Sequence, residues 1–155
     1  MHSLLWTVGA GVDAVGMTIR LNPYLNFRSE AREALEFYQS VFGGELTVST
    51  FGENGMGDDP DLAGLLMHGM LTAPHGMVIM AGDTPPGMDP PTAGTAVNLS
   101  INSEGDDLRE LWDALSEGGE VAVPFSEAPW GDIFGLVNDR FGIAWLFNQA
   151  PGPDA

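Results

Sequence analysis

An internal repeat constrains the fold of this chain more than any other feature of its sequence. The segment FGGELTV at residues 42–48 matches EGGEVAV at residues 117–123, a shift of 75 residues. Each copy follows directly on a segment in which apolar residues recur at helical spacing. Because the elements around the two copies agree as well, a chance Gly-Gly-Glu match is a poor explanation. Self-similarity at a fixed spacing indicates that one structural module has been duplicated.

The first copy of the module reads as a strand, a helix and three further strands. Alternating residues predict a strand at 22–27, and Ser29 stands where an N-cap residue would begin the helix. The helix is expected to end at Gly43-Gly44, because glycine readily adopts the conformation that follows a helix. Its apolar face is formed by Ala31, Ala34, Leu35, Tyr38 and Phe42. The later strands are expected at residues 45–51, 65–73 and 77–82, the last two as a hairpin around Pro74-His75-Gly76.

The second copy repeats this order of elements. A strand is expected at residues 95–102 and a helix at 104–117, which Gly118-Gly119 ends. The apolar face of this helix is formed by Leu108, Leu111, Trp112 and Leu115. Further strands are expected at residues 121–125, 134–138 and 143–147. The predicted fold class is therefore α+β, with two tandem βαβββ modules.

A proline-rich segment sets the expected boundary between the two modules. DTPPGMDPPTAG, which starts at Asp83, cannot hold regular structure. We expect one domain at residues 21–150, made of modules at 21–83 and 95–148 that a linker at 84–94 joins. Residues 1–20 are interpreted as an N-terminal extension, with Met17 as an alternative natural start, and residues 151–155 as a tail.

Charge and composition exclude several classes of partner. The chain has a net charge of −17, and its five basic residues are all arginines. Such a surface repels phosphate backbones and anionic lipids, so we expect neither nucleic-acid nor membrane binding. The absence of cysteine removes disulfides, thiolate catalysis and cysteine-bound zinc. Without an apolar run of roughly 20 residues or a signal peptide, a soluble, cytoplasmic protein is expected.

Several strings resemble one enzyme superfamily. ALEFYQSVFGGEL, WDALSEGGEV and DRFGIAWLFN are similar to the helix and closing-strand motifs of the vicinal oxygen chelate superfamily, which includes glyoxalase I, bleomycin-resistance proteins and extradiol dioxygenases. PYLNF, MAGD and the closing DRFG-x-x-W resemble its PhnB-like branch, which has often carried a 3-demethylubiquinone methyltransferase label. The resemblance covers residues 21–148 and implies a cup-shaped mixed sheet with the helices outside and a ligand inside. It also implies a homodimer, in which relatives sometimes exchange halves.

The resemblance also locates the positions where a metal would bind. Metal-dependent members supply His or Glu from the first and last strands of each half. The matching positions here hold Asn22 to Tyr24, Met80, Ala96 and Leu146. A catalytic divalent metal generally needs about three imidazole or carboxylate ligands. We therefore predict that the usual metal site is absent and that no cofactor is bound. The methyltransferase label gains no support either, because no glycine-rich fingerprint for a nucleotide or S-adenosylmethionine follows a strand.

Strand alternation divides the predicted strands into two faces. The face expected to line the cup holds Tyr24, Asn26, Met80, Ala96, Asn98, Ser100, Leu146 and Asn148. The face expected to pack under the helices holds Leu25, Phe27, Ile79, Val97, Leu99, Ile101, Trp145 and Phe147. The first set mixes apolar and amide groups, as sites for organic ligands do. The alternative is that its polar groups satisfy backbone atoms or trapped water.

Four further side chains are candidates for a site. His68, in an apolar strand, is either a general base or a hydrogen-bonded structural histidine. Trp130 lies in a loop, where it contacts a ligand, covers the core or contacts a second subunit. Asp132 either orients a polar ligand or is an exposed turn residue, and the latter is favoured. Asp83 lies either at the mouth of the cup or as a cap or turn residue, and again the latter is favoured.

Two functions follow from these observations. The first is a binding protein that holds a small organic molecule, aromatic or planar, without the usual metal. The alternative is an enzyme of lyase, isomerase or dioxygenase type that works without a metal or with an atypical one. In that case His68 would transfer a proton on a carbonyl compound. Sequence alone leaves open whether the chain is an enzyme.

Overall fold

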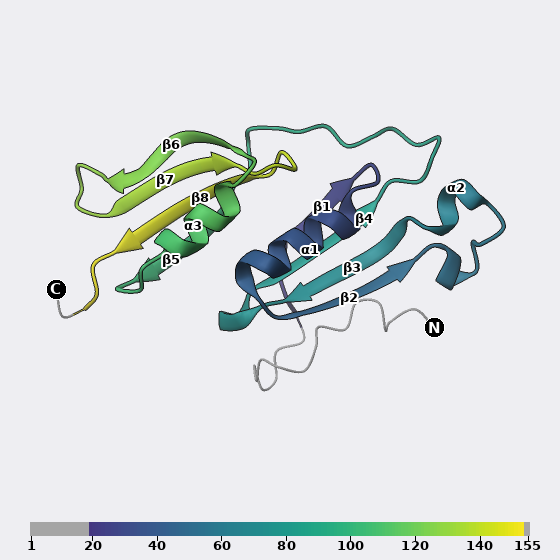
Figure 1. The fold of residues 1–155 in the computed structure, drawn as a ribbon, viewed down its shortest axis with the longest axis horizontal. Helices are drawn as coiled ribbons and strands as arrows, with labels where there is room; N and C mark the ends of the chain where they lie inside the picture. The colour runs from purple at the N-terminus through teal and green to yellow at the C-terminus, as the bar shows by residue number, and fades with distance from the viewer. Residues whose placement is uncertain (1–18, 154–155) are drawn as a thin grey trace. The chain divides into compact units, whose positions relative to one another are not determined.

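The structure, a computed structural model, describes residues 19–153 and divides into two compact units (Figure 1). The division falls between Pro91 and Thr92, inside the proline-rich segment. The predicted extension at residues 1–20, with the alternative start at Met17, lies outside the described residues apart from its last two positions. None of the described helices is long and apolar enough to cross a membrane.

The first unit is a four-stranded mixed sheet with one main helix. Its elements are β1 (Tyr24–Phe27), α1 (Ala31–Phe42), β2 (Glu45–Thr50), the 3-10 turn η2 (Gly52–Asn54), α2 (Pro60–Ala63), β3 (Leu66–Thr72), the 3-10 turn η3 (Pro74–Gly76) and β4 (Val78–Asp83). The strands are ordered β1-β4-β3-β2. β1 runs parallel to β4, and the other neighbours are antiparallel.

The second unit repeats this arrangement. Its elements are β5 (Leu99–Glu104), α3 (Arg109–Ser116), β6 (Glu120–Glu127), β7 (Ile133–Asn138) and β8 (Ala144–Ala150). The strands are ordered β5-β8-β7-β6, and β5 runs parallel to β8. Both units share the same order of strands and main helix and the same sheet topology, which confirms the predicted α+β fold of two βαβββ modules.

Helix α1 packs on one face of the first sheet, as Figure 1 shows. The apolar residues expected on its inner side, Ala31, Ala34, Leu35, Tyr38 and Phe42, are all buried. Gly69 in β3 permits the close approach, because a Cβ atom there would lie 2.4 Å from Cδ1 of Leu35. On the sheet, Leu25, Phe27 and Ile79 are buried as predicted.

An aromatic cluster fills the core of the second unit. The ring of Trp112 on α3 stacks on Phe125 at 5.3 Å and meets the edge of Phe147 at 5.3 Å. Gly135 in β7 leaves room for this indole, since a Cβ atom there would lie 2.8 Å from its ring. The guanidinium carbon of Arg109 lies over the ring of Phe125, 4.7 Å from the ring centre. The predicted packing of Trp145 and Phe147 into the core is confirmed.

The predicted starts of the first strand and of the helix in the second module are wrong. The strand expected at residues 95–102 begins only at Leu99, so Ala96, Val97 and Asn98 precede it, and Val97 is 74% exposed. The helix expected at 104–117 begins only at Arg109. Glu104 still belongs to β5, and the left-handed turn at Gly105 (φ 91°) separates strand from helix. The periodicity of apolar residues predicts both starts in the wrong place, because neither start depends on which residues are apolar.

The predicted N-cap of α1 is also wrong. Ser29 does not cap this helix; Glu30 holds the N-cap position and makes no capping hydrogen bond with its side chain. Asp83, at the end of β4, replaces it: its Oδ1 accepts a hydrogen bond from the amide of Ala31, and its Oδ2 accepts one from the amide of Leu66, both at 2.9 Å. Asp83 is therefore a capping residue, the alternative that the sequence favoured.

Candidate functional site

The first unit gathers several candidate residues on the sheet face turned away from α1. Tyr24 pairs with Met80 across β1 and β4, and Met80 pairs with Met70 across β4 and β3. Met70, Val78 and Met80 form a buried cluster, against which the half-buried Tyr24 packs. His68 lies two residues before Met70 in β3 and is buried as well. Tyr24, His68 and Met80 are thus brought together, whereas Asn26, near the end of β1, is exposed.

The ring of Tyr24 occupies space that a glycine leaves open. It stacks on the imidazole of His68, with the ring centres 5.7 Å apart and an angle of 25° between the planes. A Cβ atom at Gly82 would lie 2.5 Å from the phenol oxygen, so any larger residue there would displace the ring. The phenol donates a long hydrogen bond of 3.4 Å to the carbonyl oxygen of Met67. We call Tyr24, His68, Met70, Val78 and Met80 the Tyr24–Met80 face.

Burial sets the protonation states on this face. It lowers the pKa of His68 below the usual 6.5, because an imidazolium ion is poorly solvated there. Burial, and to a smaller extent the negative charge of Asp83, raises the pKa of Tyr24 above the usual 10.0. Near neutral pH the face therefore presents a neutral imidazole and a protonated phenol, which are able to accept and donate a proton.

The second unit places its candidates on the face turned away from Trp145 and Phe147. Ser100 pairs with Leu146, and Asn102 pairs with Asn148. The amide of Asn102 donates a hydrogen bond of 2.8 Å to the hydroxyl of Ser100. Asn102 was missed in the sequence, although it lies two residues after Ser100 and therefore on the same face. Asn98 lies before β5 and does not share in this register.

A loop residue orients the amide of Asn148. Asp132, between β6 and β7, accepts a hydrogen bond of 3.0 Å from Nδ2 of Asn148. Trp130, in the same loop, is 62% exposed and meets the ring of Phe134 at 5.5 Å. Phe134 pairs with Asn148 across β7 and β8, which joins these residues into one cluster. Phe134 was not a sequence candidate; its ring contact with Trp130 and its register with Asn148 identify it.

Metal-binding side chains do not gather in the part of the chain that is described. Between residues 19 and 153, no three His, Asp or Glu side chains lie close enough together to hold an ion. The last-strand positions carry Met80 in β4 and Leu146 in β8. These side chains offer a thioether and a hydrocarbon, which suit an organic molecule better than a divalent cation.

Comparisons with known proteins agree with this topology. Residues 20–147 match the family described as Glyoxalase/Bleomycin resistance protein/Dioxygenase superfamily. YjdN of Escherichia coli (strain K12) is 28% identical over 143 residues, which cover 83% of this chain and 93% of YjdN. The crystal structure of PA1353 from Pseudomonas aeruginosa is 32% identical with a TM-score of 0.73, and the match covers 86% of this chain and 99% of that one.

A further structural neighbour belongs to the branch that the sequence motifs resemble. The PhnB protein from Bacillus cereus has a TM-score of 0.69 at 24% identity, over 85% of this chain and 100% of that chain. At this identity the likeness concerns the fold alone. The family match, by contrast, spans most of the chain and includes both βαβββ modules. The chain therefore belongs to the glyoxalase/bleomycin resistance protein/dioxygenase superfamily.

Proposed function

We propose that this protein binds a small planar organic molecule and that the Tyr24–Met80 face contacts it. The observation that carries this proposal is the ring of Tyr24, stacked on His68 above Gly82 and packed against the methionine cluster. A buried sheet face made only for packing would have no need of two polar rings. Aromatic rings offer flat contact area, and methionine side chains adapt to irregular shapes.

The polar groups of the face suggest what the ligand carries. The phenol of Tyr24 is a donor at neutral pH, and the neutral imidazole of His68 can accept a hydrogen bond. A planar molecule with a carbonyl and a hydroxyl group would be chemically complementary to this donor and this acceptor. The proposed ligand class is therefore an aromatic carbonyl or hydroxy-carbonyl compound.

Thermal unfolding with a panel of one- to three-ring aromatic carbonyl compounds tests this proposal. A compound at 100 times its Kd should stabilise the folded protein by about 2.7 kcal/mol. For a chain of this size, such a change raises Tm by roughly 5–10 °C. A panel that leaves Tm unchanged would contradict the proposal.

The two tyrosines provide a matched pair of variants. Tyr24→Phe removes the proposed donor and should weaken binding about fivefold, the effect of one neutral hydrogen bond. Tyr38→Phe makes the same chemical change under α1, on the opposite side of the sheet, and should leave Kd unchanged. If Tyr24→Phe and Met80→Ala both bind as tightly as the unchanged protein, the ligand lies elsewhere.

The geometry of His68 supports a second candidate function. Its imidazole is buried, its pKa is lowered by that burial, and it stacks on a phenol that remains protonated. A neutral imidazole next to a protonated phenol could move a proton on a carbonyl compound. His68→Ala should abolish any such turnover, while His75→Ala, in the exposed turn η3, should not. Equal turnover by both variants would remove this mechanism.

A further inference from the structure

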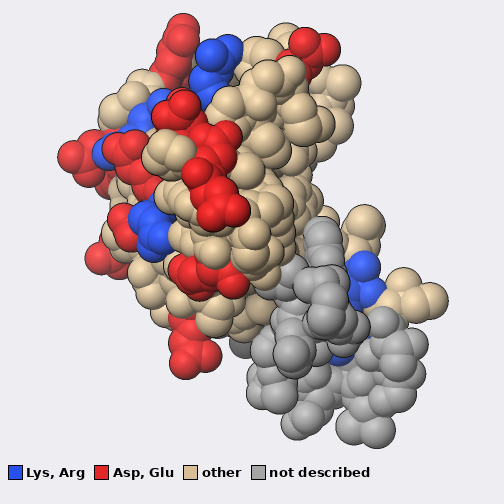
Figure 2. Space-filling model, turned by 90° about the vertical axis from the view of Figure 1, so that its right-hand side faces the viewer, with Lys and Arg blue, Asp and Glu red and all other residues tan. Residues whose placement is uncertain are grey.

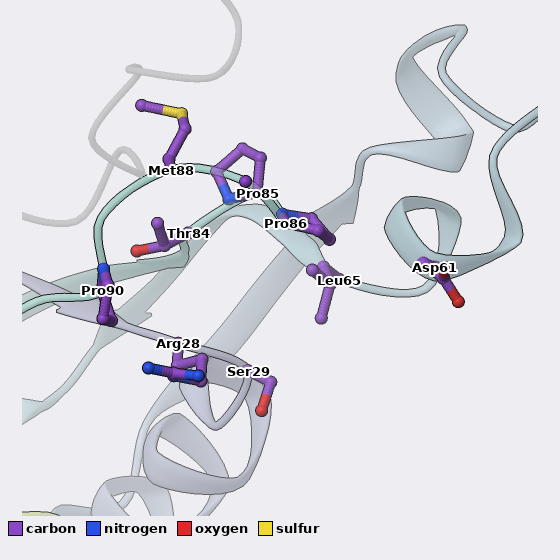
Figure 3. Close-up of a pocket in the computed structure, with 10 residues that line it drawn as sticks. Arg28, Ser29, Asp61, Leu65, Thr84, Pro85, Pro86, Met88 and Pro90 are labelled. Carbon is purple, nitrogen blue, oxygen red and sulfur yellow. The ribbon is translucent and has the colours of Figure 1, made fainter.

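A cavity in the first unit lies beyond the ends of the strands and shares no residue with the Tyr24–Met80 face. Its volume is about 320 Å³, within the range of sites for small ligands. It lies where β1 and β4 end and β3 begins, because Arg28 follows β1, Thr84 follows β4 and Leu65 precedes β3. Figure 3 shows these side chains around the cavity.

Hydrogen bonds hold the walls of this cavity together. The amide of Thr84 donates to the carbonyl oxygen of Phe27 at 2.8 Å, and the amide of Met88 donates to that of Pro85 at 3.2 Å. Asp83, the residue before Thr84, joins the starts of α1 and β3 through both of its carboxylate oxygens. The proline-rich segment is thus anchored at the site, so a ligand would meet a preformed wall and lose little entropy on ordering it.

Half of the ten lining residues have apolar side chains, and three of these are prolines. The apolar lining residues are Leu65, Pro85, Pro86, Met88 and Pro90. Proline has a fixed φ angle and no N–H group, so this wall offers flat contact area and few donors. A ligand with a compact apolar body matches such a wall, whereas a highly hydrated ion such as phosphate does not.

One cation lies among the described residues that line the cavity. Arg28 contributes a guanidinium group, and Ser29 and Thr84 contribute hydroxyl groups. Asp61 also lines the cavity, but its carboxylate points away from the other labelled side chains in Figure 3. The amide of Ala31, at the start of α1, is already bonded to Asp83, so the guanidinium is the group left to recognise an anion.

The negative charge of the protein limits which anions Arg28 could bind. The chain has five arginines, no lysine and a net charge of −17, and acidic side chains predominate over arginines on the surface in Figure 2. A multiply charged anion would be repelled by this surface. A single carboxylate is repelled less and matches the planar fork of a guanidinium group.

We propose that this cavity is a second binding site, which takes a small monocarboxylate with a compact apolar body, such as an aromatic acid. Its carboxylate pairs with the guanidinium of Arg28 and accepts a hydrogen bond from the hydroxyl of Thr84. Its apolar body packs against Pro85, Pro86 and Met88. The site is distinct from the proposed function, because no residue of the Tyr24–Met80 face takes part.

Methyl NMR of the full-length protein, labelled at its methionine methyl groups, tests this site with benzoate as the probe. The signal of Met88, assigned from the spectrum of Met88→Leu, should shift saturably with a Kd of the order of 1 mM. Benzamide has the same shape without the charge and should bind at least about tenfold more weakly. No saturable shift up to about 50 mM benzoate, far above the expected Kd, would overturn the proposal.

Paired arginine variants identify the group that binds the carboxylate. Arg28→Met should weaken benzoate binding at least about tenfold. Arg32→Met removes the same charge from an exposed position of α1 outside the lining and should leave the Kd unchanged. Thr84→Val, expected to weaken binding severalfold, is a second variant if Arg28→Met does not fold. Equal binding of benzoate and benzamide, or unchanged binding by Arg28→Met, would show an apolar crevice and not a carboxylate site.

Discussion

At the scale of single residues, Asp139 explains why the DRFG-x-x-W string is present. Its carboxylate lies buried in the turn before β8 and accepts hydrogen bonds from the amides of Phe141 (2.8 Å) and Ile143 (3.0 Å). The other oxygen accepts one of 2.9 Å from Nε1 of Trp145. The acid therefore fixes the turn and satisfies the indole N–H inside the core.

Replacing Asp139 should strongly destabilise the folded protein. Asp139→Ala leaves the indole N–H and two amides without this acceptor, so the free energy of unfolding should fall by about 3 kcal/mol or more. Urea unfolding measures this change. Asp132→Ala, which removes one bond at a half-buried loop position, is the control and should cost at most about 1 kcal/mol. Equal costs for the two variants would contradict the structural role of Asp139.

Gly82 is a second position at which one residue controls its surroundings. In Gly82→Ala, the new methyl group would lie 2.5 Å from the phenol oxygen of Tyr24 and 3.1 Å from the carbonyl of Met67. The free energy of unfolding should fall by about 1–3 kcal/mol, as for other overpacked sites. Gly64→Ala adds the same methyl group in open space, with a negative φ, and should be neutral or slightly stabilising. A neutral Gly82→Ala would mean that Tyr24 does not occupy this space.

The lowered pKa of His68 has a measurable consequence for stability. Burial disfavours the imidazolium form, so the folded-state pKa lies below the unfolded value near 6.5. As the pH falls through that value, the unfolded chain takes up a proton that the folded protein does not, and the free energy of unfolding decreases. The contribution is at most about 1.4 kcal/mol per pH unit.

Urea unfolding between about pH 7.5 and 5.5, above the range in which most carboxylates titrate, measures this effect. The unchanged protein should lose more stability over this interval than His68→Gln, which cannot take up the proton. Parallel profiles for the two proteins would show that His68 does not resist protonation.

At the scale of elements, a residue in the last strand of each module accepts a hydrogen bond from a backbone amide at the start of that module's helix. Asp83 in β4 bonds the first amide of α1, and Oε1 of Gln149 in β8 accepts a hydrogen bond of 2.9 Å from the amide of Leu108, just before α3. Asp83 is charged and bonds the first amide of its helix, whereas Gln149 is neutral and bonds the amide of the N-cap residue. Both helices therefore receive an acceptor at their start from a strand more than 40 residues away, although the first amide of α3, that of Arg109, bonds locally to Oδ1 of Asp107 at 2.9 Å.

Because Asp83 is charged and Gln149 is neutral, replacing them should lower the free energy of unfolding by different amounts. Asp83→Ala removes two charge-assisted hydrogen bonds and should lower the free energy of unfolding by about 3 kcal/mol. Gln149→Ala removes one neutral bond and should cost about 1 kcal/mol. Chemical denaturation of both variants checks the ratio, and a larger cost for Gln149→Ala would contradict it.

At the scale of the whole molecule, the family resemblance leads us to propose a homodimer. Trp130 in the second unit offers a large exposed aromatic surface for a contact between subunits. Light scattering should give twice the 16.4 kDa mass of the chain. A mass of 16.4 kDa at every concentration tested would exclude a stable dimer.

The sequence was enough to establish the architecture. The repeat of Gly-Gly-Glu after each helix and the alternation in each strand predicted two βαβββ modules and most of their core residues. These signals can be read because periodicity reports which side of an element is buried, and each element carries its own period. Tyr24 and Met80 were placed on one face for the same reason.

The tertiary structure alone decided which distant side chains meet. That Tyr24 stacks on His68 above Gly82, that Asp83 begins α1, and that Arg28 lines a proline-walled cavity could not be read from any local pattern. Each contact depends on strand register and on how chain ends pack against one another, and these are set by the whole unit at once. Local periods record burial, whereas sites form where residues remote in sequence come within contact distance.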